Sequence, residues 1–185
     1  MLISCFLDIL PKLPAELRCY GFDRYPGWCH QMQVKVNGIP VSGAVKTDKG
    51  YWMIQRSWQP GDTVSCEMEM EPERVYAHPM VRADAGCVAL RRGPIIYTFE
   101  GVDNGEDLQT LRIPREAKIE ALPYQADLLE GIVALRVTGC RKKTAVNPAL
   151  YAEDAAPEEM VTLQAIPYYA WCNRGMTHMR VWMQE

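Results

Sequence analysis

The sequence lacks the long apolar runs and the excess of positive charge that mark several classes of protein. No stretch approaches the ~18 consecutive apolar residues that a membrane-spanning helix needs. The opening segment, MLISCFLDILPKLP, has no basic start, carries Asp8 in its apolar part and shows no small-residue cleavage pattern, which argues against a signal peptide. The net charge of -3 gives no electrostatic basis for binding nucleic acid. We therefore expect a soluble protein that binds neither membranes nor nucleic acid.

The cysteines lack the spacing that redox and metal sites need. All seven are scattered, with no C-x-x-C pair and no Cys/His cluster of metal-ligand spacing, at positions 5, 19, 29, 66, 87, 140 and 172. This spacing excludes a zinc ribbon and a thioredoxin-type motif. An odd number of scattered cysteines is typical of reduced thiols that serve as small hydrophobic side chains. It favours a cytoplasmic location.

Short catalytic motifs are absent as well. The sequence contains no G-x-S-x-G, H-E-x-x-H, P-loop or G-x-G-x-x-G, and its three histidines stand far apart. Glu100 and Asp103 flank a short turn and could in principle form the carboxylate pair of a glycosidase. Acidic residues in a loop after a strand are usually solvated, so we do not expect these two to be catalytic.

The sequence is instead rich in alternating segments. In VSCEMEM, Val64, Cys66 and the two methionines share one face, which is the pattern of a half-buried strand. Asn37-Gly38 and Pro60-Gly61 tolerate the backbone angles of tight turns and predict β-hairpins. A helical period is almost absent, apart from a single turn expected in YQADLLEG. We predict an all-β fold, an antiparallel β-sandwich that is jelly-roll-like.

Two segments interrupt the alternating strand pattern, and they divide the chain into regions. The segment from Glu69 to Pro79 is charged and contains two prolines, so we place a boundary there. This predicts a partial β-sandwich over residues 1–72 and a more complete one over residues 73–185. The segment from Cys140 to Glu159 mixes a basic run with a Pro/Ala/acidic run and predicts a long surface loop.

Aromatic residues supply the remaining binding candidates. An exposed indole or phenol ring offers a flat apolar surface on which a sugar ring can stack. Trp58 follows an alternating strand and is predicted to lie in the core. Trp182 alternates out of phase with its apolar neighbours, which favours a position on the outer face or facing a second sheet. The candidate carbohydrate contacts are Trp171, Tyr168, Tyr169 and Trp182.

The order of five segments resembles glycoside hydrolase family 127, the β-L-arabinofuranosidase family that was formerly a domain of unknown function. These segments are RYPGWC (24–29), VKVNG (34–38), GYWMIQRSWQPGDTV (50–64), VRADAGCVALRRGPIIYTFEGVDN (81–104) and IPYYAWCNRGMTHMRVWM (166–183). The resemblance covers residues 24 to 185. Before it, Gly21 and Asp23 interrupt the strand that the family would have there, so residues 1–23 are atypical. We interpret the Met1 start as a truncated or frameshifted gene and expect the first half of the chain to be less stable than the second.

The resemblance implies a parent protein with a catalytic (α/α)6 barrel followed by β-sandwich domains. It also implies a cysteine nucleophile at a zinc site built from an E-x-C element and a Cys-Cys pair, where the metal keeps the thiolate deprotonated. This sequence has neither element. We therefore expect no catalytic residue, zinc ligand or other cofactor in this chain.

The resemblance points to the non-catalytic C-terminal β-sandwich region of such a hydrolase, with the barrel as its partner. Two alternatives stay open: a carbohydrate-binding module, and a structural module that forms homo-oligomers. Within VALRRGPIIYTFEGVDN, Gly93 and Pro94 predict a bend or bulge between two strands. Arg92 is expected to tie turns together through Asp84 or Asp103, and Arg91 to be solvated.

Overall fold

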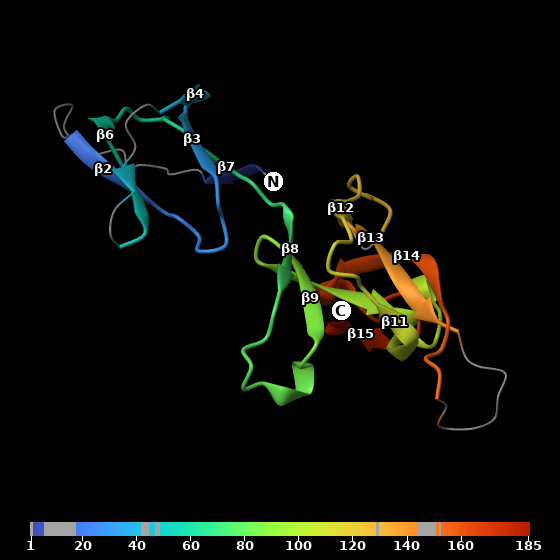
Figure 1. Cartoon of the computed structure of the whole chain (residues 1–185). Coiled ribbons are helices and arrows are strands. Elements are labelled where there is room, and N and C mark those ends of the chain that lie inside the picture. Colours follow the sequence, from blue (N-terminus) through green and yellow to red (C-terminus); the bar gives the residue numbers. More distant parts are fainter. Residues whose placement is uncertain are drawn as a thin grey trace. The chain divides into compact units, whose positions relative to one another are not determined.

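The structure is a computed structural model that describes residues 2–5, 18–41, 45–46, 49–128, 130–143, 151 and 153–185. It divides into two compact units, Met1–Met70 (unit 1) and Glu71–Glu185 (unit 2) (Figure 1). The described residues are nearly all in strands and turns, so the all-β prediction is confirmed. No helix in the described ranges has the length and apolar character to cross a membrane.

Unit 1 contains two small sheets. The first has the order β1-β7-β3-β4 and the second the order β2-β6-β5, with every pair antiparallel. The strands are β1 (Leu2–Cys5), β2 (Arg18–Arg24), β3 (Met32–Val36), β4 (Ile39–Pro40), β5 (Val45–Lys46), β6 (Tyr51–Ser57) and β7 (Val64–Met68). Strand β2 passes through Gly21 and Asp23, so the expected interruption before Arg24 is wrong. Residues 1 and 6–17 of the atypical segment lie outside the described residues.

The core of unit 1 follows from the alternation in its strands. Val64 and Cys66 are buried on one face of β7, as the sequence predicts, and they lie opposite Val36 and Val34 of β3. Ile54 of β6 joins the same cluster, so this core is shared by residues of both sheets. Trp58 packs against it, as expected.

The two predicted turns of unit 1 differ in what they join. Asn37 and Gly38 have φ of 52° and 78°, and they close a two-residue hairpin in which Val36 pairs with Ile39. At the second site Gly61 has φ of 91° and the Asp62 N–H donates to the Gln59 carbonyl. This turn forms, but the hairpin prediction is wrong because β6 and β7 belong to different sheets.

Unit 2 forms a larger sheet system whose pairings return to their starting strand. β10 pairs with β14, β14 with β13, β13 with β11, β11 with β16, β16 with β9, and β9 again with β10. Only β11–β16 is parallel among the described pairs. The strands are β8 (Pro72–Val75), β9 (Cys87–Arg92), β10 (Ile95–Glu100), β11 (Leu111–Arg112), β12 (Ile119–Ala121), β13 (Leu135–Lys142), β14 (Glu158–Pro167), β15 (Met179–Arg180) and β16 (Met183–Gln184).

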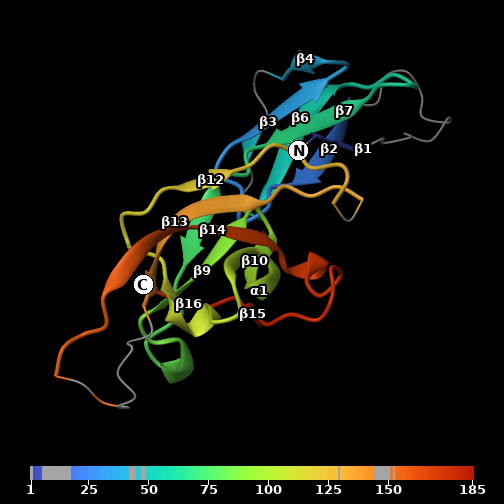
Figure 2. The ribbon, with the colours of Figure 1, turned by 90° about the vertical axis from the view of Figure 1, so that its right-hand side faces the viewer.

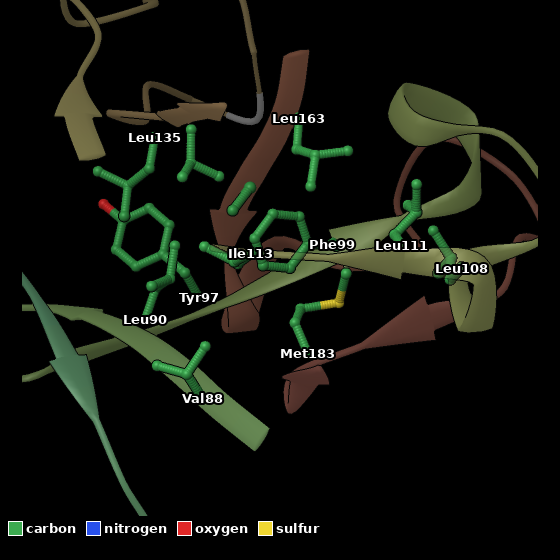
Figure 3. Close-up of a cluster of buried hydrophobic side chains, with 12 residues drawn as sticks. Val88, Leu90, Tyr97, Phe99, Leu108, Leu111, Ile113, Leu135, Leu163 and Met183 are labelled. Atoms are coloured by element: carbon green, nitrogen blue, oxygen red, sulfur yellow. The ribbon is translucent and has the colours of Figure 1, made fainter. Parts of the chain in front are cut away.

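The strands of this circuit enclose the core of unit 2. Phe99 lies fully buried at its centre, among side chains from β9, β11, β14 and β16 (Figure 3). Deleting such a buried aromatic ring typically costs about 3–5 kcal/mol. The close packing also explains Gly139 of β13, where an added Cβ would lie 2.3 Å from the Leu163 Cδ1 atom.

Two predictions about local structure in unit 2 need correction. The described residues of YQADLLEG, which are all but Leu129, form no helical turn but a tight loop closed by the Gln125–Ile132 bridge. The only α-helix described is the four-residue α1 (Gly101–Asn104). The predicted loop from Cys140 to Glu159 is shorter than expected, since β13 continues to Lys142 and β14 begins at Glu158; residues 144–150 and 152 of it lie outside the described residues.

Candidate functional site

The candidate site is formed at the end of β10, beside the segment that follows β14 and leads to β15. β10 pairs with β14 through Phe99 and Ala165, and with β15 through Phe99 and Arg180. These pairings bring α1, which follows β10, next to the segment 168–178 that connects β14 to β15 (Figure 2). This segment begins with the 3-10 helix η3 (Tyr168–Ala170).

Arg174 binds two acidic side chains at this point. Its guanidinium donates to Glu100, whose side chain is fully buried, and to Asp103, with 2.9 Å between Nη1 and Oδ1. The hydrogen bond to Asp103, and then the one to Glu100, raise the pKa of Arg174 above its ordinary value although desolvation opposes them. The expectation that both acids are solvated is therefore wrong, because Glu100 is fully buried and the Asp103 side chain is only 14% exposed. The two carboxylates are thus both bound by one guanidinium, and one of them is fully buried.

Glu100 also fixes the backbone of the returning segment. The Cys172 N–H donates to its Oε1 at 2.7 Å, and Cys172 has φ of 64°. This left-handed conformation is unfavourable for a residue with a side chain. The charged hydrogen bond offsets part of that strain and fixes the position of the chain between Trp171 and Arg174.

Asn104 holds α1 against β14. Its buried side-chain amide donates to the carbonyls of Glu100 and Gln164, and its carbonyl oxygen accepts from the Gln164 N–H. On the other side, the Gly101 N–H donates to the His178 carbonyl at 2.9 Å. α1 is therefore hydrogen-bonded to both chain segments that surround it.

Aromatic side chains project from the returning segment. Tyr168, Tyr169 and Trp171 are exposed, and the rings of Tyr168 and Trp171 lie 6.4 Å apart with an interplanar angle of 36°. Trp182 is partly buried between β15 and β16, and its backbone carbonyl accepts from Arg180 Nε. Three of the four predicted carbohydrate contacts thus come from a single short segment, and Trp182 comes from another.

The Arg-Gly-Pro element lies in the β9–β10 hairpin. Gly93, with φ of 58°, and Pro94 form its two-residue turn, and Arg92 pairs with Ile95, so the element is a tight hairpin turn and not a bulge. Asp103 binds Arg174, and among the described residues no hydrogen bond or ion pair joins Arg92 to Asp84 or Asp103, so the expected tie is not found.

Arg92 instead lies beside Tyr97. The pKa of Tyr97 is raised by burial, and the Arg92 guanidinium opposes that rise. Arg91 is not a free solvated side chain as expected, because it forms an ion pair with Glu73 across the β8–β9 pair, at 2.7 Å.

A polar cavity of about 370 Å³ lies beside α1. Its lining contains acidic, basic and hydroxyl groups from Gly105, Glu106, Asp107, Thr110, Arg141, Lys142, Lys143 and Glu159. The zinc ion that the family resemblance implies does not fit the residues present, because no group of three or more His, Cys, Asp or Glu side chains in the described ranges could hold a metal ion.

Comparison with known proteins decides the family. Residues 72–184 match the glycoside hydrolase family 127 C-terminal domain. This chain belongs to glycoside hydrolase family 127. Residues 21–70 match the GH127 middle domain of β-L-arabinofuranosidase, and both matches agree with the division between Met70 and Glu71. The resemblance seen in the sequence motifs is confirmed.

Relatives in the family are much longer than this chain. A non-reducing end β-L-arabinofuranosidase of Bifidobacterium longum subsp. longum is 35% identical over 170 residues, which are 88% of this chain and 25% of that protein. The crystal structure of a GH127 β-L-arabinofuranosidase from Geobacillus stearothermophilus T6 matches with a TM-score of 0.79 and 45% identity, over 90% of this chain and 27% of that one. A further GH127 β-arabinofuranosidase structure has a TM-score of 0.69 and 33% identity, over 93% of this chain and 25% of that one.

Arg174 and the φ of Cys172 were not identified from the sequence. The NRG segment that contains Arg174 was noted as part of the family resemblance, yet no local pattern links it to acids more than 70 residues earlier. Only the strand pairings bring these residues together.

Proposed function

We propose that this chain is the non-catalytic middle and C-terminal β region of a β-L-arabinofuranosidase-like protein. Its role is to support a catalytic (α/α)6 barrel that precedes it in the full-length protein. The observation that carries the proposal is the match of both domains in order, over only about a quarter of the relatives' length. The arginine-bound state of Glu100 and Asp103 supports a role other than catalysis for the site in unit 2.

The zinc-bound thiolate that the resemblance implies belongs, in this proposal, to the barrel. The absence of an E-x-C element and of a Cys-Cys pair from the sequence supports this assignment. The cysteine side chains that the structure describes are free thiols, with Cys29, Cys66 and Cys140 buried as small hydrophobic groups. This arrangement supports a cytoplasmic location as part of the same proposal.

Carbohydrate binding is the second candidate function. The exposed rings of Tyr168, Tyr169 and Trp171 favour it, because aromatic faces stack on sugars. The 36° tilt between Tyr168 and Trp171 weakens it, since a flat platform needs coplanar rings. Calorimetric titration with arabinan-type oligosaccharides separates the candidates: binding heat supports the second, and its absence removes it.

Incubation of the purified chain with an aryl β-L-arabinofuranoside, with and without added zinc, tests the main proposal. The expected result is no release of the aryl group above the buffer rate under either condition. Zinc-dependent turnover that increases with protein concentration would show that this chain carries its own catalytic centre.

A further inference from the structure

Several large apolar side chains are exposed on α1 and on the segment 168–176. We name them the α1–η3 patch, which consists of Val102, Tyr168, Tyr169, Trp171 and Met176. Met176 is 100% exposed, Tyr169 63% and Val102 55%. Single exposed apolar residues are ordinary, but a group of them on adjoining segments is typical of a surface that binds another protein.

The segments that carry the patch are bound to each other by hydrogen bonds. The Val102 N–H donates to Thr177 Oγ1 at 3.1 Å, which places the residue after Met176 against α1. Arg174 binds Asp103 of α1, and the Cys172 N–H binds Glu100 at the start of α1. The exposed side chains therefore stand on a backbone that is already ordered.

Order of this kind favours association. A loop that must be immobilised on binding loses conformational entropy, whereas a pre-ordered surface retains most of the free energy that its apolar contacts supply. Burying the charges of Glu100 and Arg174 costs desolvation free energy, which a segment that only connects β14 to β15 does not need to spend. The effect of this ion pair, together with the bond from the Cys172 N–H, is to hold the backbone between Trp171 and Arg174 beside α1.

We propose that the α1–η3 patch is the surface through which unit 2 docks onto the N-terminal part of the full-length family protein. The inference rests on the proposed function and names its contact surface. This chain corresponds to 25–30% of the relatives' length and matches the family's middle and C-terminal domains, so most of a relative's chain lies outside the matched region. Val102 and Met176 offer no ring for a sugar, and the tilted aromatic pair offers no flat platform, which favours a protein surface as the occupant.

The test is co-expression of this chain with the Bifidobacterium longum relative lacking the region that matches it, followed by capture through a tag on this chain. Three forms of this chain are compared: wild type, the patch variant Tyr169→Ser/Met176→Ser, and the control variant Met80→Ser/Val81→Ser. Met80 and Val81 are also exposed apolar residues of unit 2, outside the patch. Thermal unfolding of each purified form checks that the three remain equally folded.

The expected result is equal capture by wild type and control, and at least about tenfold less by the patch variant, because hot-spot truncations typically weaken an interface by that factor or more. Equal capture by all three forms would overturn the patch as the docking surface while leaving the proposed function intact. No capture by any form would contradict the proposed function and the inference together.

Two further measurements assign the patch to another occupant if the inference is wrong. Sedimentation that shows a dimer of the wild-type chain and a monomer of the patch variant would make the patch a surface between copies of this chain. Binding heat with arabinan oligosaccharides that the patch variant loses would make it a sugar site. Either result would overturn the docking of the N-terminal part.

Discussion

Replacing Arg174 by alanine removes the cation that binds Glu100 and Asp103. The Glu100 side chain is fully buried, so the variant leaves a carboxylate whose remaining described hydrogen bond is the one from the Cys172 N–H. Removing one partner of a buried ion pair costs about 3–5 kcal/mol. Because the Arg174 side chain is 21% exposed, water weakens the pair, and we take the lower limit of about 3 kcal/mol. For a unit of this size, that loss lowers Tm by about 10 °C.

Urea unfolding of unit 2 measures the loss of unfolding free energy in Arg174→Ala. Two further variants are measured for comparison. Arg91→Ala removes an ion pair with side chains 36% and 24% exposed, so it should cost at most about 1 kcal/mol. The double variant Glu100→Leu/Arg174→Met removes the fully buried Glu100 charge together with its cation and leaves Asp103, whose side chain is 14% exposed, as the acid without a cation, so it should lose less than Arg174→Ala alone. A cost for Arg174→Ala no larger than that for Arg91→Ala would refute the reasoning, as would a double variant less stable than the single one.

Three smaller perturbations probe other parts of the chain. Gly139→Ala places a Cβ against the core and should destabilise unit 2 by about 1–3 kcal/mol, whereas Gly27→Ala meets open space and should change little in the same melting assay. The Asn37 amide lowers the pKa of Asp62, so the Asp62 carboxylate stabilises unit 1 above the unfolded pKa of about 3.9 and this contribution disappears as pH falls through the lower folded-state pKa. Asp62→Asn should therefore be less stable than wild type at pH 7, by an amount that shrinks as the pH falls below about 4, and a pH-independent difference would contradict this. Arg92→Ala should lower Tm, and an unchanged Tm would contradict a structural role for that residue.

Much of the fold could be predicted from local sequence. The period of two in β7 and the Asn37-Gly38 pair are decided by neighbouring residues, so strand and hairpin follow directly. Pro60-Gly61 also predicts its turn correctly, but which sheet each flanking strand joins depends on pairings with distant residues. The parallel pairing of Arg112 with Gln184 is equally non-local.

The candidate site was less accessible to sequence reasoning. Glu100 and Asp103 were noticed as a possible acidic pair, and three of the exposed aromatics were named, since these are properties of single residues. The role of Arg174 was missed because it depends on β10 pairing with both β14 and β15. Arg92 was assigned the wrong partner for the same reason, because Asp103 was already bound by an arginine that no local pattern connects to it.

We propose that this chain supports a catalytic barrel and does not itself catalyse. Hydrolysis of an aryl β-L-arabinofuranoside in the presence of zinc tests this proposal most directly. The samples are the isolated chain, the Bifidobacterium longum relative lacking its matching region, and the two co-expressed. We predict no turnover by the isolated chain and more turnover by the co-expressed pair than by the truncated relative alone. Turnover by the isolated chain, or no gain from co-expression, would contradict the proposal.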